Sequence, residues 1–152
     1  NEARFLLGEI IVLGTYIKRK SNLIFIGREK KVIDIDELKL CLNETSSNLC
    51  LCGIDAKMIV DIKKEYPIGI IHKIYDYLED ILEISFSSLK SILFCVYEEK
   101  GVIQVNATVD ANSNFKKLKK IYPSVEIEKD EDELWYLTLK IKEGDYHEPE
   151  SI

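Results

Sequence analysis

The sequence has no excess of positive charge and no apolar run long enough for a bilayer. Its 27 acidic residues outnumber 21 basic ones, which gives a formal net charge of −6. Nonspecific nucleic-acid binding needs the opposite charge balance, so we predict no nucleic-acid partner. The apolar stretch 5–17 is broken by four small or polar residues. A membrane-spanning helix needs roughly 20 apolar residues, so we predict no span in this chain.

Cysteine is scarce and is not spaced for a metal site. The four cysteines, Cys41, Cys50, Cys52 and Cys95, lack the paired spacing that is typical of zinc ligands. We predict reduced thiols in a reducing compartment, and therefore a cytoplasmic chain. The chain does not begin with Met and carries no signal peptide. We interpret it as a fragment, compatible with the cytosolic part of a longer, membrane-attached protein.

What the sequence does contain is an opening helix, at 3–26, that is apolar on several sides. One buried helix face uses every third or fourth residue, whereas apolar residues here occupy consecutive positions at 5–7 and 10–13. A single neighbouring helix covers only one side of another. We therefore predict a four-helix bundle formed by two chains, which makes the protein a homodimer.

A second helix follows a charged connector at 27–33. Asp34 suits its N-cap, and Gly53 suits the left-handed residue that follows a helix end. Between them, apolar residues recur at spacings of three and four, which indicates one buried face. We predict that residues 1–54 form an antiparallel helical hairpin that serves for dimerisation.

Residues 55–142 mix strand and helix patterns. Runs rich in β-forming residues lie at 56–62, 92–97, 102–109, 125–128 and 134–141, and helical patterns lie at 66–89 and 115–122. This order predicts an α+β fold, in which helices cover one face of a largely antiparallel sheet as a two-layer α/β sandwich. The polar residues 143–152 are expected to form a flexible tail.

Polar clusters interrupt this pattern. Lys18, Arg19 and Lys20 precede Asn22 in the first helix, and the third helix carries acids at spacings of three and four. The basic cluster is either a docking patch for an acidic partner or a solvated helix face. The acids, Asp76, Glu79, Asp80 and Glu83, form either a metal site or the solvent side of their helix. Charge runs are usually solvated faces, and we favour that interpretation for both.

The element order and these clusters together resemble the core of sensor histidine kinases. In that family a dimerising helical hairpin carries the phosphoacceptor histidine and precedes an ATPase domain of the gyrase/Hsp90/kinase/MutL (GHKL) type. In its small size the chain is similar to the sporulation initiation phosphotransferases, which pair such a hairpin with a degenerate ATPase-like domain. The resemblance implies that residues 55–142 are a reduced version of the kinase ATPase domain.

The resemblance places Lys18 where the family has its phosphoacceptor histidine and Arg19 where it has the neighbouring acid, while Asn22 matches the family's Asn. A lysine ammonium is protonated at pH 7 and cannot replace a neutral imidazole as nucleophile. The only histidines, His72 and His147, lie outside the hairpin. We expect His72 to be at the surface or half-buried, because no second ligand is spaced for it.

The nucleotide-binding positions implied by the resemblance are also altered. Glu79 matches the first acid of the ATPase helix, but Glu83 stands where the family has its magnesium-binding Asn. Asp110 matches the Asp that holds adenine, but the glycine that follows it in the family is absent. Only Gly101 and Gly144 come after Gly69, so the glycine-rich phosphate loops are missing.

The resemblance therefore implies a degenerate histidine-kinase-like module without catalytic residues, metal or nucleotide cofactor. Such a module would act as a dimeric scaffold or regulator in two-component-type signalling, with a response-regulator-like protein as partner. Two alternatives remain open. One is an active histidine kinase or phosphotransferase that uses ATP and Mg²⁺ and needs sequence outside this chain. The other is a plain α/β protein-interaction or ligand-binding domain.

Overall fold

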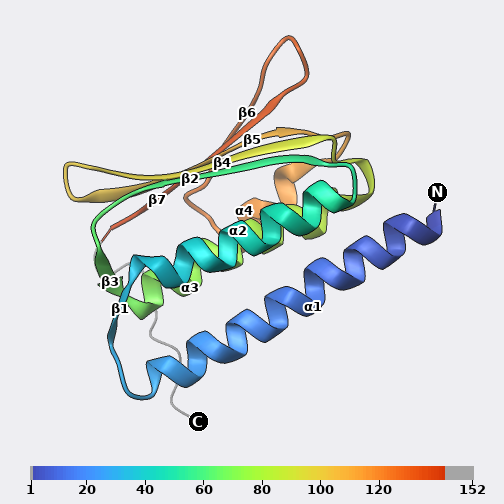
Figure 1. Ribbon diagram of the computed structural model, residues 1–152. Coiled ribbons are helices and arrows are strands. Elements are labelled where there is room, and N and C mark those ends of the chain that lie inside the picture. Colours follow the sequence, from blue (N-terminus) through green and yellow to red (C-terminus); the bar gives the residue numbers. More distant parts are fainter. Residues whose placement is uncertain (1, 143–152) are drawn as a thin grey trace.

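The structure, a computed structural model, describes residues 2–142 and is built from a five-stranded sheet, a middle layer of helices and one helix outside that layer (Figure 1). The tail predicted at 143–152 and His147 lie outside the described residues. In chain order the elements are α1 (Glu2–Gly27), β1 (Val32–Asp34), α2 (Ile35–Leu51), β2 (Asp55–Asp61), β3 (Glu65–Pro67), α3 (Ile68–Ser85), β4 (Ser91–Glu99), β5 (Val102–Asp110), α4 (Leu118–Ile121), β6 (Glu126–Lys129) and β7 (Trp135–Ile141), with short 3₁₀ turns at Phe86–Ser88 and Phe115–Lys117.

The five-stranded sheet has the order β2-β4-β5-β7-β6. Only the β2–β4 pair is parallel, and the other three pairs are antiparallel. Alternation along the strands buries one face, including Phe94, Val105 and Leu137, against the helices. The opposite face carries half-exposed residues of β4 and β5 such as Cys95 and Asn106. The predicted α+β fold, with helices on one face of a largely antiparallel sheet, is confirmed.

Helix α2 begins and ends at the residues that the sequence predicted. The Asp34 carboxylate accepts the N–H of Asp36 at 2.8 Å and caps α2, and Gly53 adopts the left-handed φ of 82° after the helix end. The start of α3 differs slightly from the prediction, because Pro67 is still extended, with ψ of 137°, and α3 begins at Ile68.

A small two-stranded sheet of β1 and β3 was not predicted. Val32–Asp34 pairs antiparallel with Glu65–Pro67. Three-residue strands carry too little alternation to be recognised in a sequence. This pairing joins the connector after α1 to the segment before α3. It therefore holds the C-terminal end of α1 near the N-terminal end of α3.

One hydrophobic core runs through the sheet, α2 and α3 and reaches α1. It includes Phe94 of β4, Tyr75 of α3, Leu42 of α2 and Leu23 of α1. In Figure 1, α2 and α3 lie beneath the sheet and α1 lies beneath them, antiparallel to α2. The predicted boundary between 1–54 and 55–142 therefore falls between elements that share a core, and the division into two domains stays a prediction.

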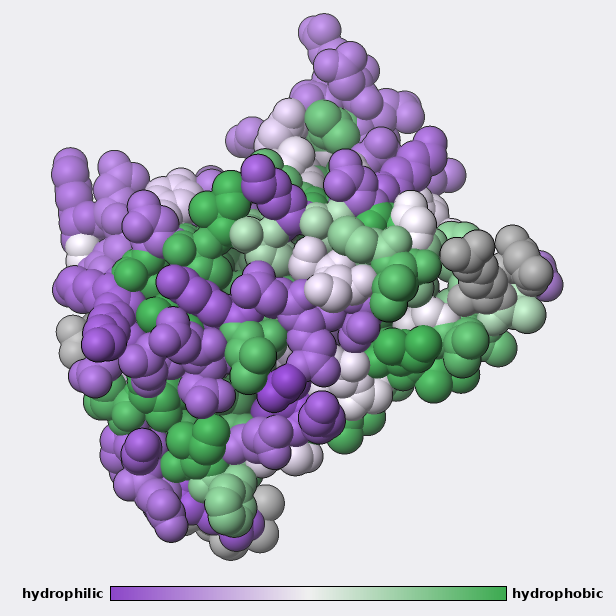
Figure 2. All heavy atoms as spheres, viewed as in Figure 1, coloured by the Kyte–Doolittle hydropathy of each residue, from purple (hydrophilic) through white to green (hydrophobic). Residues whose placement is uncertain are grey.

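Among residues 2–142, helix α1 is covered on only one side. Val12 and Leu23 are buried against the chain, and Phe5, partly exposed, contacts the Phe86 ring edge-to-face. On the other side large apolar side chains are exposed: Leu6, Leu7, Ile10, Ile11, Leu13, Ile17 and Phe25. Figure 2 shows hydrophobic residues gathered over both ends of α1, most densely toward its N-terminal half. Within residues 2–142 no helix combines the length and the apolar character that a membrane crossing requires.

Candidate functional site

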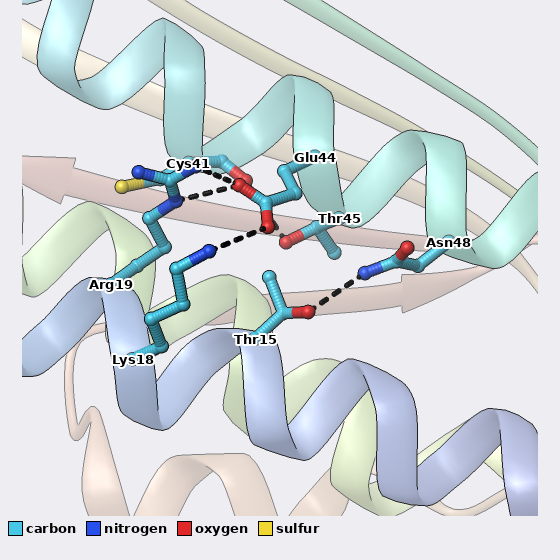
Figure 3. Close-up of polar contacts among 7 residues, drawn as sticks. All are labelled: Thr15, Lys18, Arg19, Cys41, Glu44, Thr45 and Asn48. Atoms are coloured by element: carbon cyan, nitrogen blue, oxygen red, sulfur yellow. Dashed lines mark hydrogen bonds and ion pairs between the residues drawn. The ribbon is translucent and has the colours of Figure 1, made fainter.

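The basic cluster of α1 lies against its own chain. Arg19 donates from Nε to Glu44 Oε2 at 2.6 Å, and a terminal guanidinium nitrogen contacts the same oxygen. Lys18 Nζ lies 3.8 Å from Glu44 Oε1. Figure 3 shows both cations of α1 converging on this single carboxylate of α2. The Arg19 side chain is 18% exposed and that of Lys18 is 63% exposed, so the solvated-face interpretation fails for Arg19 and fits Lys18.

Two further contacts bring α1 close to α2. Asn48 Nδ2 donates to Thr15 Oγ1 at 3.0 Å, one turn from the Arg19 contact (Figure 3). Toward the N-terminus of α1, a Cβ placed on Gly8 would lie 2.4 Å from Cys52 Sγ. Real Cβ atoms do not approach sulfur so closely, so the absence of a side chain at residue 8 is what allows the two helices to meet there.

The third cation of the cluster, Lys20, faces α3. Its Nζ lies 2.8 Å from Asp76 Oδ1 and 2.5 Å from His72 Nδ1. The Tyr16 hydroxyl donates to the same Asp76 oxygen at 2.7 Å. One carboxylate of α3 therefore binds two side chains of α1, just as one carboxylate of α2 does.

His72 is buried, which corrects the expectation of a surface or half-buried residue. Only 5% of it is exposed, because the turn of α3 that carries it is covered by α1. Burial, and then the neighbouring Lys20 charge, lower the pKa of His72 to about 4, so its imidazole is neutral at pH 7. Its Nε2 is buried without a hydrogen-bond partner among the described residues. The imidazole is therefore inaccessible to a protein partner.

A groove of about 360 Å³ runs between the N-terminal half of α1 and the C-terminal half of α3. Its α3 wall carries Glu79, Asp80 and Glu83, so the structure does bring the two predicted nucleotide-helix acids together. Its α1 wall adds Glu9 and apolar side chains including Leu13. Four carboxylates and no basic residue line the groove, which makes it a poor environment for phosphate.

Glu79 is the most perturbed acid of the groove. Burial, and then the charges of Asp80, Glu83 and Asp76, raise the pKa of Glu79 to about 8. Burial also raises the pKa of Asp80, although the Tyr122 hydroxyl, which donates to it at 2.6 Å, partly offsets that rise. These acids are not arranged as a metal site, because within 2–142 no group of three or more His, Cys, Asp or Glu residues could hold a metal ion.

The remaining predicted positions lie apart from these contacts. Asn22 is exposed on α1, one turn beyond Lys18. Asp110 ends β5, where its backbone carbonyl accepts the N–H of Lys90 at 2.8 Å, and it does not line the groove. The structure thus gathers Lys18 with Arg19, and Glu79 with Glu83, but leaves Asn22 and Asp110 outside both groups.

Sequence reasoning did not single out Glu44, and it gave Asp76 only as part of the acidic cluster of α3, not as a carboxylate that holds α1 in place. Glu44 lies at a spacing of three from Cys41 on α2, and Asp76 lies at a spacing of three from Glu79 on α3, so both look like ordinary solvent-facing acids. The excess of cations at one point of α1 was a signal that acids should oppose it. Which acids those are depends on how the helices cross, which a helix pattern does not reveal.

No family model matches the chain, and no curated protein matches its sequence. Its fold is similar to that of a bacterial phosphotransferase, with 10% identity and a TM-score of 0.50 over 90% of this chain and 92% of that one. It is also similar to the histidine kinase AdeS of Acinetobacter baumannii, with 9% identity and a TM-score of 0.51 over 89% of this chain and 77% of that one. The chain therefore has a histidine-kinase-like fold, as predicted.

Proposed function

We propose that the chain is a degenerate histidine-kinase-like signalling module that acts as a dimeric scaffold or regulator, without phosphoryl transfer of its own. The observation that carries this proposal is the contact of Lys18 and Arg19 with Glu44 on a kinase-like fold. The position that the family resemblance assigns to the phosphoacceptor holds ion-paired cations, and those cations fasten the helix to its own chain.

Phosphoryl acceptance needs an accessible nucleophile with a free electron pair. Lys18 is exposed, but an ammonium group has no free pair at pH 7. Arg19 stays protonated in proteins, and its fork is already bound to Glu44. His72 is neutral, but burial keeps it from a receiver domain. The chemistry of these residues supports a binding role over a transfer role.

Nucleotide binding is disfavoured by the charge of the groove. A triphosphate would face Glu79, Asp80, Glu83 and Glu9 at short range with no lysine or arginine to offset them. Proton uptake by Glu79 lowers this repulsion but supplies no cation. A partner protein that recognises the fold, such as a receiver domain, fits this arrangement better than a nucleotide.

The dimer is supported by the apolar side of α1. Seven large apolar residues of one helix are exposed together, and soluble chains seldom leave such a patch uncovered unless it is an interaction site. A second copy of α1 would cover it, as in the hairpin bundles of the family that the chain resembles.

Three measurements on the full chain test the proposal. Light scattering after size exclusion should give the mass of a dimer, and calorimetric titration with Mg²⁺ and ATP should give no heat of binding. A panel of receiver domains, phosphorylated with acetyl phosphate, should include one that binds the chain without losing its phosphate to it.

ATP binding at micromolar concentration would instead favour the active kinase or phosphotransferase. A monomer that binds no receiver domain would favour the plain α/β interaction domain. Of the three hypotheses, only the dimeric regulator predicts a dimer that binds no ATP and does bind a receiver domain.

A further inference from the structure

The outer side of α1 carries a regular alternation of large and small residues. Ile10, Ile17 and Ile24 recur every seven residues, and a second series with the same repeat runs between them, from Leu7 through Gly14 to Ser21. These six residues, which we call the outer seam, are spaced by three and four and so share one helix face. The opposite face, with Val12 and Arg19, packs on the chain itself.

Gly14 lies in the middle of the outer seam, and among residues 2–142 a Cβ added there would meet nothing within 4 Å. Glycine inside a helix costs about 1 kcal/mol relative to alanine, and here no close contact within the chain explains it. Ser21 is also suited to a close contact, because its hydroxyl already donates to the Ile17 carbonyl at 2.8 Å and leaves no unpaired donor on the seam.

Resting on the dimer of the proposed function, we propose that two copies join by packing their outer seams antiparallel, with Ile10 and Ile17 of one α1 each seated over a small residue of the other. Ile17 of one copy then lies over Gly14 of its partner, and Ile10 lies over Ser21. Ile24 lies beside Leu7 at either end. The two-fold axis passes between the levels of Gly14 and Ile17, so the contact is isologous and closes at two copies.

Volume decides between the two possible orientations. A parallel pair in register would place Gly14 over Gly14 and Ser21 over Ser21, and the resulting voids would forfeit dispersion contacts. The antiparallel pair sets a large side chain against a small one in the four central layers, and only the end layers of Leu7 and Ile24 pair two large side chains. Small residues at the contact also let the helix axes approach closely.

Charge favours the same orientation. The first half of α1 carries Glu2, Arg4 and Glu9, with a net charge of −1, whereas Lys18, Arg28, Glu29 and Lys30 in the second half and just beyond it sum to +2. A parallel pair brings like charges together along the helices. The antiparallel pair places the basic end of each copy beside the acidic end of the other, and it also opposes the two helix dipoles.

The arrangement also accounts for four further exposed apolar residues of α1. Leu6 and Leu13 flank the outer seam on one side, and Ile11 and Phe25 flank it on the other, at the positions that cover the edges of a two-helix contact. Residues 4–27, nearly the full length of α1, overlap in this pairing. The occupant of the exposed face is thus a second copy of the same helix.

Spin labels measure the orientation directly. In a background with Cys50, Cys52 and Cys95 replaced by alanine, a nitroxide at Arg28→Cys reports the distance between the two helix ends by pulsed electron paramagnetic resonance. The antiparallel pair places residue 28 beside residue 3 of the partner, so the labels should lie about 37 Å apart at a rise of about 1.5 Å per residue. A parallel pair would hold them about 10 Å apart.

The outcomes separate this inference from the proposed function. A dimer with the short distance overturns the antiparallel packing and leaves the dimeric module standing. A monomer by light scattering overturns both, and it leaves the apolar face for an occupant of another kind. A dimer with the long distance supports both.

A substitution tests the same contact independently. Gly14→Leu fills the space that the partner's Ile17 would occupy, so it should weaken dimerisation at least tenfold while circular dichroism of the monomer stays unchanged. The control Asn43→Leu adds a similar side chain at an exposed position of α2, outside the seam, and should leave the dimer intact. A Gly14→Leu protein with the parent dissociation constant overturns the proposal.

Discussion

The two sides of α1 depart from the usual distribution of side chains. The side that faces α2 and α3 combines the buried Val12 and Leu23 with polar contacts, because Arg19 and Lys20 bind Glu44 and Asp76, and Tyr16 shares the second of these carboxylates. The side that faces solvent carries apolar residues such as Ile17, which is 56% exposed. In most surface helices the apolar stripe faces the core and the charges face water.

The two sides of α1 therefore have different roles: the inner side orients the helix on its own chain, and the outer side provides surface for association. Partly buried ion pairs contribute little net stability, but they strongly disfavour any placement that leaves one member unpaired. The inner side thereby sets how α1 is oriented on its own chain. The outer side keeps the hydrophobic surface that provides most of the driving force for association. The two glycines show the same division, since Gly8 is needed inside the chain and Gly14 is not.

The largest effect that separates the two sides should come from truncating a buried leucine. Leu23, 1% exposed, contributes to the core, and Leu23→Ala should lower the free energy of unfolding by about 2–5 kcal/mol. The control Ile17→Ala removes a similar side chain from the outer side and should change it by less than about 0.5 kcal/mol when the protein is dilute enough to be monomeric. Urea unfolding at low concentration measures both, and equal losses would contradict the division.

The two glycines offer the next test. Gly8→Leu should destabilise the monomer by about 1–3 kcal/mol, because its side chain must displace Cys52. Gly14→Leu should stabilise the monomer by up to about 1 kcal/mol, since leucine favours helix and meets open space there. A double mutant with Cys52→Ala should recover part of the Gly8→Leu loss. A destabilised Gly14→Leu monomer would mean that residue 14 does pack within the chain.

The groove where the two sides of α1 meet should make stability depend on pH. Glu79 has a folded pKa of about 8 against an unfolded value of 4.5, so the folded chain binds the extra proton between these values and loses stability as the pH rises through 8. His72, whose folded pKa is lowered, acts in the opposite direction below pH 6.5. Between pH 6.5 and 8 only the Glu79 contribution of these two remains, and stability should fall.

The size of that fall should be about 1 kcal/mol, because solvent reaches part of the carboxyl group and screens it. Glu79→Gln should remove most of the decline, as measured by urea unfolding at pH 6.5 and pH 8. Glu83→Gln, at an exposed neighbour in the same groove, serves as the matched control and should keep most of it. A wild-type stability that does not fall across this window would contradict a folded Glu79 pKa of about 8.

The smallest effect should distinguish the two cations that share Glu44. Arg19→Gln should cost about 1 kcal/mol, since its guanidinium is largely covered and makes the shorter contact. Lys18→Gln should cost less than about 0.5 kcal/mol, because the ammonium is exposed and 3.8 Å from its partner. Raising the salt concentration should reduce the Lys18 difference first. A larger loss of stability for Lys18→Gln than for Arg19→Gln would contradict the conclusion that Arg19 makes the stronger contact with Glu44.

Much of the fold could be predicted because its signals are local. The caps at Asp34 and Gly53, and the alternation of β7, act within a few residues and appear in the structure where they were expected. The strands of the β1–β3 sheet were missed because each has only three residues. The groove acids Glu79 and Glu83 were identified as candidates through the family resemblance, but their apolar partners on α1 were not.

Composition and spacing by themselves determined that the chain has an α+β fold and an opening helix with more apolar surface than one neighbour can cover. Only the tertiary structure decided which side of that helix turns inward. The helix pattern is nearly uniform around its circumference, so local preferences could not choose a face. The choice was made by the crossing of α1 over α2 and α3, which brings Glu44 and Asp76 opposite Arg19 and Lys20.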